Sequence, residues 1–505
     1  MALSIAFEGL PILSLALLSP LVGALLLLGL RLQGRALKIG AFLFTLPPLL
    51  LGLFLLFDYG IALNSGLLYE ERYAWIPGLG ASIHLGVDGL SVPMLFLTGV
   101  IFPLTVVFSW DQLHRQRDYF VNFLVLEFAV LGVFLAWDML LFYVFWEIVL
   151  IPMFFIIHIW GGENRKYAAI KFLAYTFIAS LIMLVGLLAL YFAAAPVLGA
   201  RSFDLLDLQR AGQIGAYGRG LQVAAFGALF VGFATKMPTV PLHTWLPDAH
   251  VQAPTGGSVV LAAILLKLGS YGLIRVSLPL LPQGAHAWVT PMMILGLVSM
   301  IYGAFLALAQ DDLKSMIAYS SISHMGAALL GISTLNTLGI TGAVYMMLAH
   351  GFISAMLFMS AGVVQHHTGT RLIGRLGGLA NGSMMPMASA VTLFAYLASL
   401  GLPGLAGFVA ELTILIGTYQ AFGWVVVPAL ITLVVTAGYY LYAFQRAYHG
   451  PVRGDVHVHG DIAWYEFWPM LALALLTFLF GILPSLTADS VGDFSRDLLA
   501  AMGVA

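Results

Sequence analysis

The chain has 505 residues, of which 61% are hydrophobic and only 9% are charged, with a formal net charge of −2. Soluble proteins carry about 25% charged residues, so this composition predicts a helical protein that crosses a membrane many times. The small net charge gives no indication of nucleic-acid binding, and the absence of cysteine excludes disulfides and thiolate-held iron–sulfur clusters on this chain.

Repeated apolar runs predict an all-α polytopic membrane protein with about 14 transmembrane helices. In chain order, the expected spans are 9–30, 36–57, 89–110, 119–136, 138–160, 168–193, 221–242, 253–278, 287–309, 315–333, 338–364, 386–420, 424–446 and 467–485. The 386–420 stretch is too long for one straight span, so we expect it to bend at its Gly/Pro cluster.

The segments between spans are short. The longest ones, 58–88, 194–220, 365–385 and 447–466, are too short for a nucleotide-binding domain and contain no Gly-rich phosphate-binding motif. Redox chemistry would therefore have to occur on a partner. Turn glycines and alternating residues in RYAWIPGLGASIHLGVDGLS predict an outer hairpin, and 202–210 is expected to form a short interfacial helix.

The distribution of basic residues predicts the orientation. Assigning alternate loops to opposite sides places 13 Lys and Arg residues on one side and 6 on the other, with two lysines inside spans. Because basic loops stay in the cytoplasm, we expect the richer side to be cytoplasmic and both termini to face outward.

Four charged residues interrupt long apolar runs: Glu147, Lys236, Lys267 and Glu411. A charge near the bilayer centre costs at least about 2.5–3.5 kcal/mol, so retaining four of them indicates that the protein moves charge across the membrane. The structural alternatives are a glutamate hydrogen-bonded within the bundle and lysines that snorkel to a span end.

Lys236 is expected to lie at a break in its span, because Pro238 and Pro241 follow it in GFATKMPTVPLHTWLPDAH. Non-helical backbone at membrane depth lines protein or a water-filled cavity, so this lysine is positioned to meet water. Glu147, in LLFYVFWEIVLIP, is the expected partner, and its movement toward or away from Lys236 would load or release a proton.

Lys267 follows the apolar run PTGGSVVLAAILLK and has no acidic neighbour within a helical turn, which suits a mid-membrane proton acceptor. His324 and His350 lie in mid-span and, in sequence, between Lys267 and Glu411. They fit a relay, since imidazole exchanges protons near neutral pH, although packed hydrogen-bonding histidines are the alternative. Glu411 follows the Gly/Pro cluster 401–407, a second break beside a charge, and is expected to be the terminal proton site.

Other polar residues carry weaker signals. Glu127 lies in mid-span in FLVLEFAVL and fits a relay member or a helix–helix hydrogen bond equally well. His243 and His250 are expected at the cytoplasmic mouth rather than in a metal site. Lys314 and the adjacent His366–His367 are expected in solvated loops.

An inverted repeat is predicted from geometry. The pair Glu147 and Lys236 is echoed by His324 and Glu411 at offsets of 177 and 175 residues. Five spans separate equivalent positions, so the two copies would have opposite orientations, with broken helices as in many transporters. The expected divisions are 1–118 (three N-terminal spans and an outer loop), 119–280 and 281–446 (the two five-helix repeats), and 447–505 (a loop and the last span).

The block TKMPTVPLHTWLPDAHVQAPTGGSVVLAAILLKLGSYGLIR resembles the signature of antiporter-like subunits of respiratory complex I. The stretches FWEIVLIPMFF, AYSSISHMG, MLAHGFISA and GLPGLAGFVAE extend the likeness over about residues 85–445. Glutamate at position 411 is similar to the M subunit (mitochondrial chain 4), whereas L, N and Mrp subunits typically carry lysine there.

The resemblance implies roles for the residues singled out above. Glu147 and Lys236 match the family's ion pair, Lys267 its central lysine, His324 and His350 its connecting histidines, and Glu411 its exit residue. No role for Glu127 is implied.

The resemblance also implies a function: a proton-translocating subunit of NADH:quinone oxidoreductase in a bacterial cytoplasmic membrane, an organelle membrane being possible. Flavin, Fe–S clusters and quinone are expected on partners, which are other membrane subunits, including antiporter-like ones, and a peripheral redox arm. The alternatives are a subunit of a ferredoxin- or hydrogenase-linked complex, or of a Mrp-type Na⁺/H⁺ antiporter. A structural spacer remains a third reading.

Overall fold

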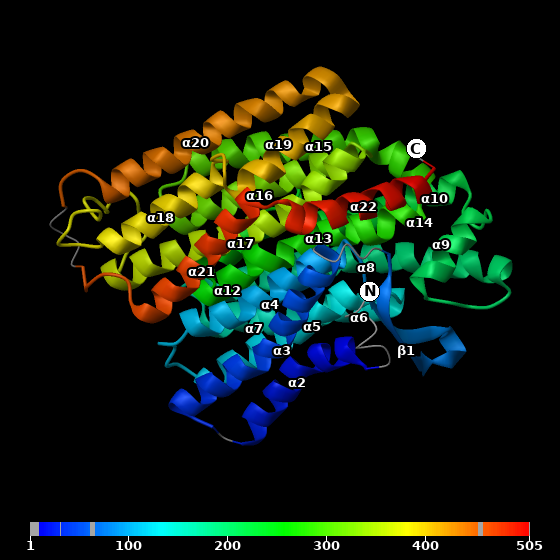
Figure 1. Ribbon diagram of the computed structural model, residues 1–505, viewed down its shortest axis with the longest axis horizontal. Coiled ribbons are helices and arrows are strands. Elements are labelled where there is room, and N and C mark those ends of the chain that lie inside the picture. Colours follow the sequence, from blue (N-terminus) through cyan, green and yellow to red (C-terminus); the bar gives the residue numbers. More distant parts are fainter. Residues whose placement is uncertain (1–9, 31, 61–65, 453–457, 504–505) are drawn as a thin grey trace.

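The computed structural model describes residues 10–30, 32–60, 66–452 and 458–503. Within them the chain forms a bundle of long helices that run roughly along one axis (Figure 1). The prediction of an all-α membrane protein is confirmed, apart from one small two-stranded sheet. Residue 9 of the first expected span, and Arg31 and Arg453 of the basic loops, lie outside the described residues.

The described residues of the N-terminal part form four α-helices, a short 3₁₀ turn and a β-hairpin, and the hairpin lies at one end of the bundle (Figure 1). Its elements are α2 (Ile12–Gly29), α3 (Gly34–Gly60), β1 (Leu68–Ile76), η1 (Pro77–Leu79), β2 (Ala81–Val87), α4 (Ser91–Phe108) and α5 (Gln116–Leu135). The antiparallel strands pair Tyr73 with Ile83, and Gly80 completes their connection with a φ of 68°. The expected hairpin is therefore confirmed.

The next helices contain the first break. They are α6 (Met139–Ile148), α7 (Leu150–Trp160), α8 (Arg165–Leu198), α9 (Leu205–Gln213), α10 (Arg219–Lys236) and α11 (Trp245–Gln252). Between α10 and α11 the chain is non-helical, as Pro238 and Pro241 predict. The Trp245 indole donates to the Thr235 carbonyl at 2.9 Å and Ser299 Oγ accepts from the Val240 amide, so polar backbone at the break has partners.

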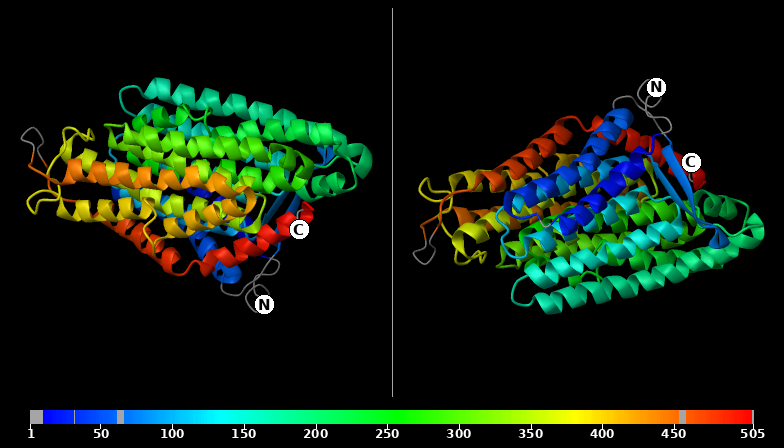
Figure 2. Two further views of the ribbon diagram at one scale, coloured as in Figure 1. Left: turned by 90° about the horizontal axis from the view of Figure 1, so that it is seen from above. Right: turned by 90° about the horizontal axis from the view of Figure 1, so that it is seen from below.

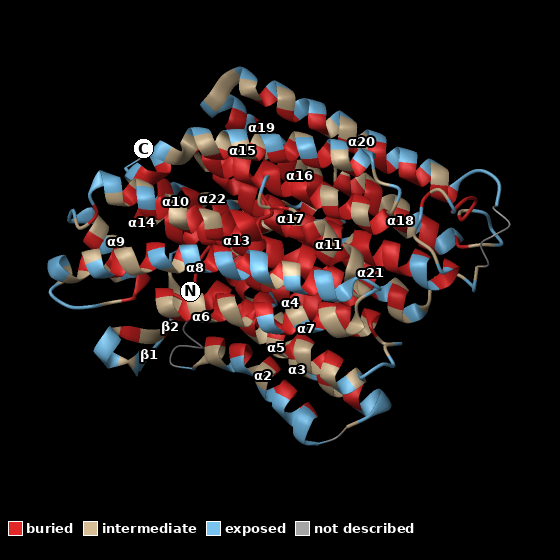
Figure 3. Cartoon of the chain, turned by 180° about the vertical axis from the view of Figure 1, so that it is seen from behind, coloured by how far each residue is buried: buried red, intermediate tan, exposed pale blue. Residues whose placement is uncertain are grey.

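A continuous helix from Thr255 to Leu280 follows, in which α-helical and π-helical turns alternate. It comprises α12 (Thr255–Val260), η2 (Leu261–Leu265), α13 (Leu266–Gly272), η3 (Leu273–Ser277) and α14 (Leu278–Leu280). This helix and α17 (Thr337–Thr368) are the most deeply buried spans, whereas α2, α3 and α8 keep exposed apolar faces (Figure 3). The two views in Figure 2 place α8 along an outer edge.

The remaining helices contain the second break. They are α15 (Pro282–Leu308), α16 (Leu313–Ser333), α17, α18 (Pro386–Ser399), α19 (Ala406–Phe422), η4 (Gly423–Val425), α20 (Val426–Tyr448), α21 (Trp464–Ile482) and α22 (Ser485–Ala501). The chain bends between α18 and α19, as expected for 386–420, through Gly401 and Gly404, whose φ angles are 80° and 90°. The final helix α22, which packs against α17 and α3, was not predicted.

Length and composition alone do not confirm the count of about 14 spans. Twelve described segments are long and apolar enough to cross a membrane. Residues 406–448 count among these twelve as one segment, although Gly423 and η4 divide α19 from α20. The helix α10, which ends at Lys236, is not among the twelve.

Two expected loop positions were wrong. Lys314 lies in the first turn of α16 and is buried, because its ammonium group reaches back to donate to the Ala253 carbonyl at 2.9 Å. His366 and His367 lie on the last turn of α17, which extends beyond the predicted end of its span.

Candidate functional site

Four predicted residues from four helices form a chain of polar side chains inside the bundle. Lys267 Nζ lies 2.7 Å from His350 Nδ1. The rings of His350 and His324 are 5.4 Å apart, centroid to centroid, and His324 Nδ1 lies 3.6 Å from Glu411 Oε1. All four are buried. We call Lys267, His350, His324 and Glu411 the central polar chain.

A π-helical segment shapes the backbone at Lys267. In the π-helical segment η2, backbone hydrogen bonds join residues five apart instead of four. Some carbonyl groups are therefore free to accept from other donors. Lys267 Nζ takes one of them, donating to the Ala262 carbonyl at 2.5 Å. The lysine therefore has one fixed acceptor on its own helix and one contact, to His350, that leads across the bundle.

A branch of hydroxyl groups continues from His324 next to Glu411. Ser399 Oγ lies 3.3 Å from His324 Nε2 and donates to Tyr440 OH at 2.9 Å, and Tyr440 donates to Ser320 Oγ at 2.9 Å. A cavity of about 10 Å³, about the size needed for one water molecule, lies beside Glu411 and His324. Sequence reasoning missed Ser399 and Tyr440, although polar residues inside apolar helices were a usable signal.

Glu147 and Lys236 lie near each other without forming an ion pair. Lys236, the last residue of α10, is buried and donates to the Trp146 carbonyl at 3.3 Å, with Nζ 4.0 Å from the centroid of the Trp146 ring. Glu147 lies close enough for its charge to act on Lys236, but its Oε1 has no hydrogen-bond partner among the described residues. The tryptophan thus occupies the contact that the expected pair would make.

No hydrogen bond between described residues joins Lys236 to Lys267. Their helices touch through backbone instead: a Cβ atom on Gly269 would lie 2.4 Å from the Phe233 carbonyl oxygen. Ser270 donates to the Met237 sulfur at 2.9 Å in the same region. The structure therefore separates the site into a part around Lys236 and the central polar chain.

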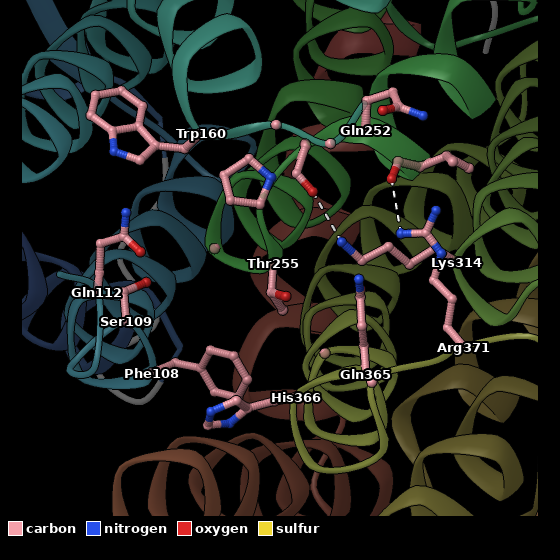
Figure 4. A pocket seen from close by; sticks show the side chains of 18 of the residues that line it. Phe108, Ser109, Gln112, Trp160, Gln252, Thr255, Lys314, Gln365, His366 and Arg371 are labelled. Carbon is pink, nitrogen blue, oxygen red and sulfur yellow. Dashed lines mark hydrogen bonds between the residues drawn. The ribbon is translucent and has the colours of Figure 1, made fainter. Parts of the chain in front are cut away.

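A cavity of about 930 Å³ opens at the end of the bundle that carries the basic loops, and Lys314 and Arg371 lie on its wall (Figure 4). His250, which does not line this cavity, is fully buried rather than at a mouth and is stacked on Phe358 at 4.3 Å between ring centroids. Neither ring nitrogen of His250 has a partner in the described chain, and the charges of both Lys314 and Lys267 act on it.

Glu127 stands apart from these groups. It is fully buried on α5, and neither carboxyl oxygen has a hydrogen-bond partner among the described residues. The geometry therefore supports neither the relay contact nor the helix–helix hydrogen bond that its sequence position suggested.

Comparison with known proteins shows which family the whole chain resembles. Residues 136–436 match the family model described as NADH:quinone oxidoreductase/Mrp antiporter, TM. The chain is 41% identical to the F(420)H(2) dehydrogenase subunit M of Methanosarcina mazei over 98% of its length and 100% of the relative. It is 44% identical to the NADH-quinone oxidoreductase subunit M of Rhodobacter capsulatus over 89% and 87% of the two chains.

Solved structures show the same fold. A chain of respiratory complex I from Thermus thermophilus superimposes with a TM-score of 0.87 at 32% identity, covering 97% of this chain and 100% of that one. A chain of the Mrp complex from Dietzia sp. shares the fold with a TM-score of 0.80 at 19% identity, covering 100% of both chains. The protein therefore belongs to the family of NADH:quinone oxidoreductase and Mrp antiporter transmembrane subunits.

Proposed function

We propose that this chain is a proton-translocating membrane subunit of an NADH:quinone oxidoreductase of the complex I type. The observation that carries this proposal is the central polar chain, in which four ionisable side chains from four helices follow one another inside an apolar bundle. Ionisable groups at such depth are costly to retain, and they mark ion pathways in membrane proteins.

Each member has a role that its contacts suit. Lys267 accepts a proton and passes it to His350, whose Nδ1 is within hydrogen-bond distance. His350 and His324 relay it, and water completes the step between rings that do not touch directly. Glu411 is the terminal site, because it borders a second helix break and a small cavity.

Glu147 and Lys236 form the part of the site that responds to a neighbouring subunit. Lys236 rests on Trp146 in this structure, so an approach of Glu147 would give the ammonium group a counter-charge. That change alters the field at Lys267 and couples proton movement to an event elsewhere in the complex. Glu127 has no contact that gives it a role in this scheme.

Protons reach Lys267 from the basic end of the bundle. The open cavity leads to Lys314, and His250 lies within electrostatic reach of both Lys314 and Lys267. We infer that this end is cytoplasmic, that both termini face outward, and that the chain resides in a bacterial cytoplasmic membrane. Residues 119–280 and 281–446 would be the inverted repeats, each with one broken helix.

The redox chemistry belongs to partner chains in this proposal. The two subunit M relatives named above belong to a dehydrogenase and an oxidoreductase, and flavin, Fe–S clusters and quinone would lie on a peripheral arm and neighbouring subunits. The electron donor is a separate question: the relative that matches 98% of this chain belongs to an F(420)H(2) dehydrogenase. A complex with that donor is the second candidate, with the same proton chemistry on this chain.

The test uses inside-out vesicles that contain the assembled complex. It measures the number of protons taken up per electron transferred. Lys267→Met removes the ammonium group, and Lys267→Arg keeps a positive charge but holds its proton at any physiological pH. Both should lower the proton-to-electron ratio. Lys171→Met, which breaks a half-exposed pair with Asp248 at 2.7 Å, is the matched control and should leave the ratio unchanged.

A normal ratio in Lys267→Arg would show that only the charge matters, which contradicts proton transfer through this side chain. Replacing the donor in the same vesicles, NADH against reduced F420, separates the two candidate complexes.

A further inference from the structure

A cluster of imidazole and carboxylate groups lies where the end of α17 meets the start of α21. His366 Nδ1 is 2.8 Å from Glu466 Oε1, and His367 Nε2 is 2.9 Å from Glu466 Oε2. One atom of each residue can be chosen so that all three lie within 4.8 Å of one another. The cluster is separate from the central polar chain.

The contacts of this cluster cannot all be satisfied by a neutral histidine and an ionised glutamate, so a positive charge is needed between them. His367 Nδ1 lies 2.8 Å from the His459 carbonyl oxygen, which only accepts, so the proton of a neutral ring is on Nδ1. The lone pair of Nε2 then faces an acceptor, the Glu466 carboxylate, at 2.9 Å. A proton or a metal cation must occupy that contact.

The outer contacts of these residues are those of a metal site. Metal-ligating histidines donate their other ring N–H to a carbonyl or carboxylate, which fixes the ring orientation. His367 has the His459 carbonyl in that position. His366 Nε2 faces Asp111 Oδ2 at 3.6 Å, an ion-pair separation slightly longer than a hydrogen bond. The Ala463 amide donates to Glu466 Oε2 at 2.9 Å and holds the carboxylate.

The geometry also leaves one side open. Zinc ligands at about 2.1 Å in a tetrahedron lie about 3.4 Å apart. The contacts of 2.8 and 2.9 Å to the two carboxylate oxygens would widen toward this value, and the longer separations within the group, which are at most 4.8 Å, would close toward it. His366, Asp111 and Glu466 line the cavity of about 930 Å³, and His366 is exposed there beside Phe108 (Figure 4). Water from the cavity can supply a fourth ligand.

We propose that His366, His367 and Glu466 form a binding site for a divalent transition metal of the zinc type, with Asp111 orienting His366. Imidazole nitrogen and carboxylate oxygen are the ligands that zinc accepts in such three-residue sites. The metal joins the end of α17 to the start of α21 at the mouth of the cavity. This site does not depend on the proton-pumping proposal.

The experiment uses the full-length chain in detergent, purified without a polyhistidine tag, and Co²⁺ as the spectroscopic probe. One Co²⁺ per chain should bind with visible d–d bands, and Zn²⁺ should displace it. His366→Ala should abolish the bands, as should Glu466→Gln. Asp111→Asn should weaken binding by about 10–100-fold, the usual effect of losing an orienting partner.

Controls separate loss of the site from loss of the fold. His114→Ala removes another exposed histidine, three residues after Asp111, and should bind like the native chain. Thermal unfolding without metal should be the same for His366→Ala and the native chain, because this side chain is exposed, while Zn²⁺ should raise the midpoint of the native chain only. Native binding in His366→Ala, or no saturable binding by the native chain, would overturn the proposal.

Discussion

The ion pair between Arg275 and Asp88 offers a sharp test of how the end of the bundle near the β-hairpin is held together. Arg275 Nη1 donates to Asp88 Oδ2 at 2.6 Å, and Nη2 donates to Oδ1. The two residues are 4% and 5% exposed. Asp88 Oδ1 also accepts from the amides of Leu90 and Ser91 at 3.1 Å, so this pair ties the start of α4 to η3.

The expected loss of unfolding free energy follows from the unpaired buried charge that each single substitution leaves in the protein. Arg275→Met leaves the Asp88 carboxylate buried without a counter-charge, which costs about 3–5 kcal/mol of unfolding free energy. The guanidinium also lies 4.4 Å from the centroid of the Trp137 ring, and this lost contact adds up to about 2 kcal/mol. Asp88→Asn leaves a buried guanidinium instead. In the double variant neither charge remains, and the asparagine oxygen still accepts from both amides.

The assay is equilibrium unfolding in mixed micelles of a mild detergent and SDS, for the two single variants and the double variant. The double variant should lose about 2–3 kcal/mol less than the sum of the single losses. Arg210→Met is the control, because its exposed contact with Asp207 at 3.4 Å is worth about 0–1 kcal/mol. Additive losses, or an Arg275→Met loss no larger than that of Arg210→Met, would refute the reasoning.

Three further predictions concern other contacts. Burial acts to lower the pKa of His84, but ring contacts with carboxylates, Asp204 foremost, outweigh it and raise the pKa above 6.5. The thermal midpoint should therefore fall as the pH rises past 6.5 toward the folded-state pKa, and His84→Gln should remove this dependence. Gly269→Ala should cost about 1–3 kcal/mol in the same unfolding assay, because its Cβ would meet the Phe233 carbonyl. Tyr440→Phe should slow proton uptake in the vesicle assay without changing electron transfer in uncoupled vesicles, and unchanged uptake would exclude the hydroxyl branch from the path.

Local chemistry explains which parts of the fold could be predicted from the sequence. Pro238 and Pro241 remove backbone donors, and the positive φ of Gly401 and Gly404 suits only residues without a side chain, so both helix breaks were correctly placed. The β-hairpin followed from the same kind of signal. These features depend on a few neighbouring residues, and the local conformational energies that favour them do not depend on packing against the rest of the bundle.

Features that depend on packing between distant helices were not predictable in this way. The contact between Lys267 and His350 joins residues 83 positions apart, and the π-helical turns around Lys267 have no counterpart in a hydropathy pattern. Lys314 lies in a short polar segment and His366 lies past the predicted end of its span, so both looked like loop residues. Lys314 is instead buried against the Ala253 carbonyl, and His366, although exposed, lies on the last turn of α17 beside Glu466.

The two helix breaks place the buried charges at opposite ends of helical dipoles. Lys236 is the last residue of α10, at the partly negative end, whereas Glu411 lies in the second turn of α19, toward the partly positive end. The Lys236 ammonium group is therefore stabilised by the backbone of its own half-helix even without an ion-pair partner, and the Glu411 carboxylate, one turn away from its helix start, is stabilised less. Between them, Lys267, His350 and His324 have no such helix end beside them, since all three lie in the interior of continuous spans. A positive charge in the middle of the site thus rests in a less favourable place than one at Lys236. The two breaks therefore give the ends of the buried site a backbone environment for charge that its middle lacks.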